Sequence, residues 1–166
     1  MLWCKPGTFM MGSPRGETGR YSSDTQYEVT LTQGFYLGKH EVTQEQWEKV
    51  MGTNPSNFKG ATLPVETVSW KDAMKFCKKL TQVEKAAGRL PEGHVYTLPT
   101  EAQWEYACRA GTTTATAFGD SLSSKQANFR GGYPYGGASK GPSLGKTTEV
   151  GTYPANAWGF HDLHGN

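Results

Sequence analysis

Apolar side chains recur three and four residues apart in three segments of the chain, which is the spacing of one face of an α-helix. Each segment follows a Thr or Ser whose hydroxyl can accept a hydrogen bond from a free backbone N–H, and a Gln or Asp three residues later can bond back to the backbone. These pairs are Thr43 with Gln46, Ser69 with Asp72, and Thr100 with Gln103. The sequence therefore predicts three helices, ending at Gly52, near Ala86–Gly88 and at Gly111.

Each predicted helix carries a tryptophan on its apolar stripe, and these residues are Trp47, Trp70 and Trp104. A large ring on a core-facing stripe removes much apolar surface from water. We expect the three tryptophans to be buried and to hold the helices in place.

Strands are predicted where apolar and polar residues alternate. Five segments have this pattern: residues 3–11, 27–32, 35–42, 94–98 and 149–153. The first is interrupted at Pro6-Gly7, because proline cannot donate to a strand ladder. Gln33-Gly34 separates the second segment from the third by a turn, so these two segments are expected to pair as a hairpin.

Residues 112–146 show neither the apolar spacing of a helix nor the alternation of a strand, and they are rich in Gly, Ser, Thr and Pro. Such a long loop inside a compact domain is usually functional, or is held by something other than an apolar core. Three helices, short strands and an irregular second half together predict an α+β fold class with little regular secondary structure.

The chain has 166 residues and a formal net charge of +2 at pH 7. This length predicts one domain with one core. The small, scattered charge argues against nucleic acid as a partner, and the lack of an apolar run of about 18 residues predicts no membrane span. Cys4, Cys77 and Cys108 are odd in number and widely spaced, so we expect free thiols, with Cys77 and Cys108 buried on helices, rather than a disulfide framework or a zinc site.

The segment Leu98–Ala107 resembles a signature of the formylglycine-generating enzyme family, the sulfatase-modifying factors. Other motifs of this family follow in the same order along the chain. They lie at residues 7–13, 36–43, 64–70, 127–129 and 156–166. Several long motifs in a fixed order span nearly the whole chain, which makes the resemblance specific for the family and much less specific for any one activity.

The resemblance implies the fold of this family, a variant of the C-type lectin fold. Members of the family oxidise a cysteine of a protein or peptide substrate, a sulfatase, to formylglycine, with molecular oxygen and a copper ion held by two cysteines. Those cysteines lie beyond a Gly-Asn-x-Trp-Glu-Trp motif, inside which this chain ends at Asn166. The resemblance therefore implies an incomplete domain over residues 1–166, which has no catalytic residue of its own and is inactive alone. Copper is expected only in the C-terminal part that follows.

The same resemblance bears on the cysteines of the predicted helices. Cys77 and Cys108 match positions whose cysteines, in some members of the family, form disulfides with partners in that C-terminal part. We therefore expect both thiols to be free in this chain and not bonded to each other.

The resemblance also implies calcium as a cofactor. One family site uses the side chain of Asn128 and the carbonyl of Phe129, completed by an Asp and a carbonyl at positions where this chain has Pro142 and Leu144. No Asp or Glu occurs between Phe129 and Thr148. The alternative that Asn128 only caps a turn stays open.

A second family site uses the side chain at Asp162 and the carbonyl of Gly165, followed by a carbonyl and a Glu that would lie past Asn166. We therefore expect at most weak calcium binding. His161 and His164 flank Asp162 at a spacing that could hold a transition metal, but two exposed histidines are expected to bind nothing.

Glu101 and Glu105 lie one helical turn apart and could mimic a catalytic carboxylate pair. We expect them to be cap and surface charges instead. Two further functions stay open beside the enzyme: a non-catalytic, C-type-lectin-like module that displays loops for binding, and a scaffold domain fused to a kinase or to an iron-dependent sulfoxide-forming module.

Overall fold

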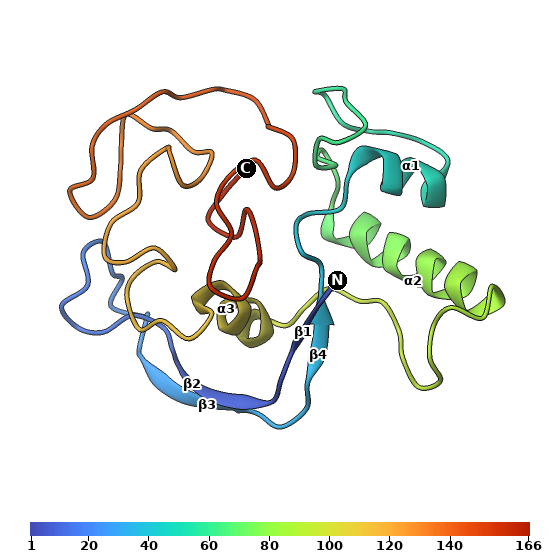
Figure 1. Cartoon of the computed structure of the whole chain (residues 1–166), viewed down its shortest axis with the longest axis horizontal. Helices are drawn as coiled ribbons and strands as arrows, with labels where there is room; N and C mark the ends of the chain where they lie inside the picture. Colours follow the sequence, from blue (N-terminus) through green and yellow to red (C-terminus); the bar gives the residue numbers. More distant parts are fainter. The chain divides into compact units, whose positions relative to one another are not determined.

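The computed structural model describes residues 1–166, and it divides into two compact units (Figure 1). The first unit contains residues 1–40 and 100–166, and the second contains residues 41–99. The chain has three helices and four short strands, so the α+β fold class with little regular structure is confirmed. None of the helices has the length and apolar character needed to cross a lipid bilayer.

The strands of the first unit form one bent, two-stranded antiparallel ribbon. Its strands are β1 (Leu2–Cys4), β2 (Gly7–Met11), β3 (Tyr27–Leu31) and β4 (Phe35–Leu37). β1 pairs with β4, and β2 pairs with β3. The ribbon therefore runs residues 2–11 against residues 27–37, and the predicted hairpin between residues 27–32 and 35–42 is wrong.

The bend of the ribbon explains why that hairpin does not form. Cys4 lies opposite Phe35 and Gly7 lies opposite Leu31, so Lys5 and Pro6 face the three residues 32–34, as in a β-bulge. Gly34 does not turn the chain back at this point. A Cβ there would lie 2.3 Å from a ring carbon of Trp3, so the glycine makes room for the Trp3 ring while the strand continues.

Helix α3 (Glu101–Arg109) packs on this ribbon with its buried face. The core of the first unit centres on Cys4, Ala107 and Phe160. Beside it, the Tyr106 ring contacts both Phe9 and Trp158, with ring centroids 5.2 and 4.8 Å apart. Residues far apart in the sequence thus meet around one turn of α3.

The side chain of Asn156 joins this core to the irregular C-terminal segment. It is buried, and its Nδ2 donates to the carbonyls of Ala107 at 2.8 Å and Cys108 at 3.2 Å. Its Oδ1 accepts from the backbone N–H groups of Trp158 and Phe160. One amide therefore satisfies carbonyls near the end of α3 and also closes the turn that inserts Phe160 into the core.

The second unit contains helices α1 (Gln44–Met51) and α2 (Trp70–Ala86). Trp47 and Phe76 stack face to face in its core, with centroids 5.0 Å apart and an interplanar angle of 2°. All three capping boxes predicted from the sequence are present, at Thr43, Ser69 and Thr100. Gly52 also ends α1 in the left-handed conformation, as predicted.

The tryptophan prediction is correct for one helix and wrong for two. Trp47 is 4% exposed, whereas Trp70 is 68% and Trp104 is 43% exposed. Side chains on a helix lean toward its N-terminus, so a ring at the first helical position, as in Trp70, projects past the end of α2. Trp104 instead stands on the wall of a cavity described below.

Two predicted strands do not form. Residues 94–98 have no strand partner; the backbone N–H of Tyr96 donates to the Thr81 hydroxyl at 2.9 Å instead. Residues 149–153 form a turn, in which the N–H of Thr152 donates to the carbonyl of Glu149. Both segments have the residue types that favour a strand, but neither lies beside another strand with which it could pair.

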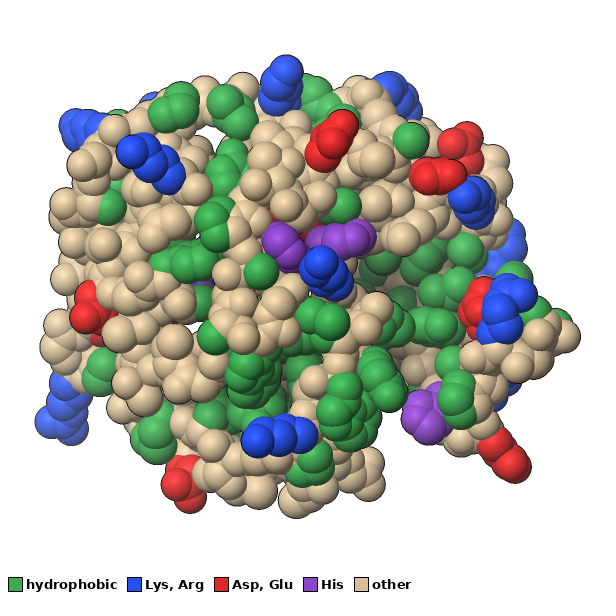
Figure 2. Space-filling view, in the orientation of Figure 1, with side chains coloured by type: hydrophobic (Ala, Val, Ile, Leu, Met, Phe, Trp, Pro, Cys, Tyr) green, Lys and Arg blue, Asp and Glu red, His purple; other side chains and the backbone are tan.

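Charged side chains of both signs are dispersed over the face drawn in Figure 2. No basic patch is visible on this face. This agrees with the small net charge of the sequence.

A buried glutamine organises the loop that joins α1 to α2. Gln44 is 1% exposed, and its amide nitrogen, Nε2, donates to the carbonyls of Phe58 at 2.7 Å and Pro64 at 3.2 Å. Its Oε1 accepts from Asn54 Nδ2 and from the backbone N–H of Gly60. All four hydrogen-bonding positions of the amide are used, so the loop is built around this side chain.

Replacing Gln44 by Ala is therefore expected to destabilise the protein by about 3 kcal/mol or more, because it leaves several part-buried groups without a partner. The urea-unfolding midpoint of the full chain measures the loss. Gln82→Ala is the matched control, since Gln82 is exposed on α2 and such a change stays within about 0.5 kcal/mol. Equal midpoints for the two variants would show that the Gln44 network contributes nothing.

Candidate functional site

Asn128 and Gly165, which the sequence assigned to two different calcium sites, lie in contact. The backbone N–H of Asn128 donates to the carbonyl of Gly165 at 3.2 Å. The Asn128 side chain donates from Nδ2 to the carbonyl of Lys146 at 2.8 Å and to Oδ1 of Asn166 at 3.3 Å. Asn128 thus holds two loop segments together, which is a structural role.

The rest of the first predicted calcium site offers little to a cation. Phe129 follows Asn128 and is half-buried. Pro142 and Leu144 are exposed and carry no side-chain oxygen, whereas Ca²⁺ needs six to eight oxygen ligands. The residues present at this site therefore do not fit a calcium ion.

Asp162 is different, because one of its carboxylate oxygens has no partner. Oδ2 accepts from the backbone N–H of Gly151 at 2.6 Å, while Oδ1 is buried without a hydrogen bond. The residue also has a positive φ of 62°, which is unusual for any residue other than glycine. A buried carboxylate oxygen without a donor is costly, so Asp162 fits a cation ligand. No group of three or more His, Cys, Asp or Glu side chains could hold a metal ion.

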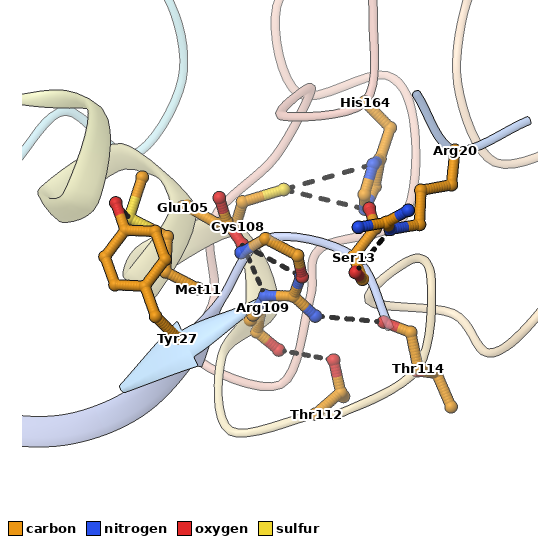
Figure 3. Close-up of polar contacts among 11 residues, drawn as sticks. Met11, Ser13, Arg20, Tyr27, Glu105, Cys108, Arg109, Thr112, Thr114 and His164 are labelled. Carbon is orange, nitrogen blue, oxygen red and sulfur yellow. Dashed lines mark hydrogen bonds and ion pairs between the residues drawn. The ribbon is translucent and has the colours of Figure 1, made fainter. Parts of the chain in front are cut away.

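A cavity of about 430 Å³ opens in the first unit between α3, the β2–β3 loop and residues 114–117. Its less exposed lining residues come from distant parts of the chain. They are Thr116 and, drawn in Figure 3, Met11, Glu105, Cys108, Arg109 and His164. This cavity was not predicted from the sequence.

An ion pair between Glu105 and Arg109 forms part of the cavity wall. Arg109 Nε lies 2.8 Å from Glu105 Oε1, and their side chains are 14% and 20% exposed. Glu105 Oε1 also accepts from the backbone N–H of Gly12, and Arg109 Nη2 donates to the Gly12 carbonyl. The prediction that Glu105 is a surface charge is therefore wrong, because the pair clamps the end of β2 to α3.

Cys108 and His164 meet inside the cavity, 56 residues apart in sequence. Cys108 Sγ lies 3.9 Å from Nδ1 and 3.8 Å from Nε2 of the ring. His164 Nε2 accepts from the backbone N–H of Ala117 at 3.1 Å, which places the imidazole proton on Nδ1. His164 is thus half-buried and packed against Cys108, where the sequence predicted an exposed histidine.

Burial keeps both of these groups neutral. It raises the pKa of the Cys108 thiol to about 11, and it lowers the pKa of His164 below its ordinary value. An activated cysteine needs a thiolate that is stabilised by a nearby cation. Here the raised pKa of Cys108 disfavours the thiolate, and the lowered pKa of His164 disfavours the imidazolium cation. Burial therefore disfavours the ionised forms that an activated nucleophile and its base would take. Sequence reasoning missed the contact because it depends on the path of the C-terminal segment.

The other two cysteines are equally shielded. All three thiols are free and buried, as predicted for Cys77 and Cys108. Burial raises the pKa of Cys4 to about 11 and also raises the pKa of Cys77. Cys4 packs in the core of the first unit and Cys77 in the core of the second.

The remaining predicted groups have simple structural roles. His161 Nδ1 lies 2.8 Å from the carbonyl of Tyr153, and its backbone N–H donates to the carbonyl of Lys39. Glu101 is exposed in the first turn of α3, as expected for a cap charge.

Comparison with known proteins gives a consistent result. The family model described as "Sulfatase-modifying factor enzyme 1-like domain" matches residues 1–166. The chaperone protein LppX of Paenibacillus barcinonensis is 35% identical over 87% of this chain and 64% of its own length. The formylglycine-generating enzyme of Mycobacterium tuberculosis is 35% identical over 72% of this chain and 36% of its own length.

Among solved structures, PvdO from Pseudomonas aeruginosa superposes with a TM-score of 0.72 at 24% sequence identity. The match covers 99% of this chain and 66% of PvdO, and at this identity it shows a shared fold. The chain spans less than two thirds of the length of LppX and about a third of the length of the mycobacterial enzyme.

We expect the three thiols to react slowly with a thiol reagent at pH 8 in the native protein and rapidly in guanidinium, where their pKa values return to about 8.5. Because the folded state keeps Cys4 and Cys108 protonated up to about pH 11, stability should also fall as the pH rises from about 8.5 to 11. Rapid labelling of native Cys108 at pH 8, or a Cys77–Cys108 bridge in a non-reducing peptide map, would contradict this.

Proposed function

Because the chain belongs to the sulfatase-modifying factor enzyme 1-like domain family, we propose that it forms part of an enzyme that oxidises a cysteine of a sulfatase-like protein to formylglycine. The match of the family model over residues 1–166 carries the proposal. Similarity to proteins named formylglycine-generating enzyme, in Mycobacterium tuberculosis and in mouse, supports it.

In this proposal the chain supplies scaffold and not the reaction centre. Copper favours soft sulfur ligands, and thiols bind metals as thiolates. Burial raises the pKa of each of the three thiols, Cys4, Cys77 and Cys108, and so disfavours their thiolate forms. Cys77 also belongs to a different unit from the other two. The three cysteines therefore do not fit a copper site, and we assign none of them to the oxidation.

A second candidate function is a non-catalytic module that displays loops for binding. Residues 112–166 contain no helix or strand, yet side-chain amides at Asn128, Asn156 and Asn166 fix their path. A rigid frame with exposed loops suits recognition. The relative LppX is named a chaperone protein, and not an oxidising enzyme. Two cysteines about five residues apart, encoded after Asn166 in the parent gene, would favour the enzyme over this module.

We further propose that calcium, if bound, uses the Asp162 carboxylate and the Gly165 carbonyl. The partnerless Oδ1 of Asp162 supports this. Against a strong site, Gly165 already accepts a hydrogen bond from Asn128, and the Asn128 amide is engaged by Lys146. Few other oxygens are free for the ion, so the affinity is expected to be about millimolar, as in the weakest calcium modules.

The catalytic prediction is that the copper-supplied chain leaves a Cys-x-Pro-x-Arg peptide unmodified, because no pair of thiols is arranged to hold the metal. Mass spectrometry of the peptide after incubation measures the outcome. The mycobacterial formylglycine-generating enzyme, assayed with the same peptide, is the positive control. Turnover by this chain that disappears in Cys77→Ser or Cys108→Ser would refute the scaffold role.

The calcium prediction is a small thermal shift. Melting with calcium and with a chelator should differ by less than about 5 °C, which corresponds to roughly 1 kcal/mol for a domain of this size. Asp162→Asn should remove the shift, whereas Asp120→Asn, an exposed control, should keep it. If the Asp162 variant still responds to calcium as the parent chain does, Asp162 is not a ligand.

A further inference from the structure

The second unit, residues 41–99, packs both of its ends on a core of its own. It is one uninterrupted stretch of the chain, and its buried cluster includes the stacked rings of Trp47 and Phe76. Val42, next to the entry, and Tyr96, close to the exit, both pack against this cluster. The unit is therefore closed by its own side chains.

Hydrogen bonds close the same unit near both ends. Near the entry, the backbone N–H of Val65 donates to the carbonyl of Val42 at 2.9 Å. Near the exit, the backbone N–H of Tyr96 donates to the Thr81 hydroxyl at 2.9 Å. The amide of Gln44 makes its four hydrogen bonds to groups of this unit. All of these polar contacts are internal to the unit.

The first unit builds its core without residues 41–99. Its central apolar cluster and the side chains packed against that cluster come from residues 2–37 and 107–163, and its strands lie within residues 2–37. If residues 41–99 lost their structure, they would form a flexible loop. The entropic cost of closing a loop grows only logarithmically with its length, so the first unit can keep its own contacts while the second is unfolded.

The second unit also has the smaller core. Its buried apolar side chains are those of Trp47, Phe76 and Cys77, in a segment of about 60 residues, a size at which a domain is only marginally stable. The other buried apolar side chains belong to the first unit, which is longer. Local opening is most frequent where few apolar contacts are buried, so the second unit should open more often than the first.

We propose that residues 41–99 form a separate cooperative unit, which unfolds and refolds while the first unit stays native. The chain carries its own reporters, because Cys77 is buried in the second unit, whereas Cys4 and Cys108 are buried in the first. Opening of the second unit therefore makes Cys77 the first thiol to reach solvent. This behaviour requires neither copper nor a substrate, so it is independent of the proposed oxidation.

The test is alkylation of the full chain by uncharged iodoacetamide, in urea below the main unfolding transition. The thiolate attacks the methylene carbon and expels iodide, and peptide mass spectrometry gives the rate at each cysteine. Dividing each rate by the rate of the same thiol in guanidinium removes the effect of sequence neighbours such as Lys78. The normalised rate of Cys77 is expected to exceed those of Cys4 and Cys108 about tenfold or more.

Two matched variants test whether each opening is cooperative. Gln44→Ala removes buried hydrogen bonds of the second unit and should accelerate labelling of Cys77 about a hundredfold or more. It should leave the rates of Cys4 and Cys108 unchanged. Asn156→Ala removes buried hydrogen bonds of the first unit, so it should accelerate labelling of Cys4 and Cys108 and leave Cys77 unchanged.

Milder changes keep the comparison open where circular dichroism shows that one of these variants does not fold. Val68→Ala and Leu37→Val reduce side chains that pack against the second and the first core, respectively, and should give a several-fold effect of the same pattern. Equal acceleration at all three thiols would mean that the chain unfolds as one unit. An unchanged Cys77 rate in Gln44→Ala would mean that α2 frays locally. Either result, or a normalised Cys77 rate no higher than the others, overturns the proposal.

Discussion

The first unit depends on the side-chain amide of Asn156. With few helices and strands, much of the backbone there lacks a regular hydrogen-bond partner, and a buried unpaired group is costly. Asn156 satisfies two carbonyls of α3 and two N–H groups of its own turn. Gln44 does the same for the loop of the second unit. In this fold, buried amides replace the sheet that a more regular protein would use.

Local chemistry could be predicted from the sequence, and long-range pairing could not. The capping boxes at Thr43, Ser69 and Thr100 are present because they need only residues three apart. The predicted hairpin at Gln33-Gly34 fails because its strands pair with residues 2–11 instead. Propensity identifies an extended segment, but only the rest of the chain decides its neighbour.

The candidate sites divide in the same way. The resemblance drew attention to Asp162, where one carboxylate oxygen is buried without a hydrogen bond, but it assigned Asn128 and Gly165 to separate sites although they touch. The cavity was missed entirely, because the Cys108–His164 contact spans 56 residues. The spacing of Glu105 and Arg109 allows an i, i+4 ion pair, but the sequence analysis treated Glu105 as a surface charge, and the hydrogen bonds of this pair to Gly12 depend on the path of a distant strand.

The clamp on Gly12 also closes the base of the β2–β3 loop. Gly12 lies so close to Thr25 that a Cβ would be 2.7 Å from the Thr25 carbonyl oxygen, and Ser13 bridges Thr25 directly. The two ends of the loop at residues 14–24 are therefore held close together. Doubling the length of such a loop adds only about 0.6 kcal/mol to the entropic cost of closing it. The fold can therefore accept insertions in this loop. Such insertions would change the loop side of the cavity and leave the α3 side unchanged.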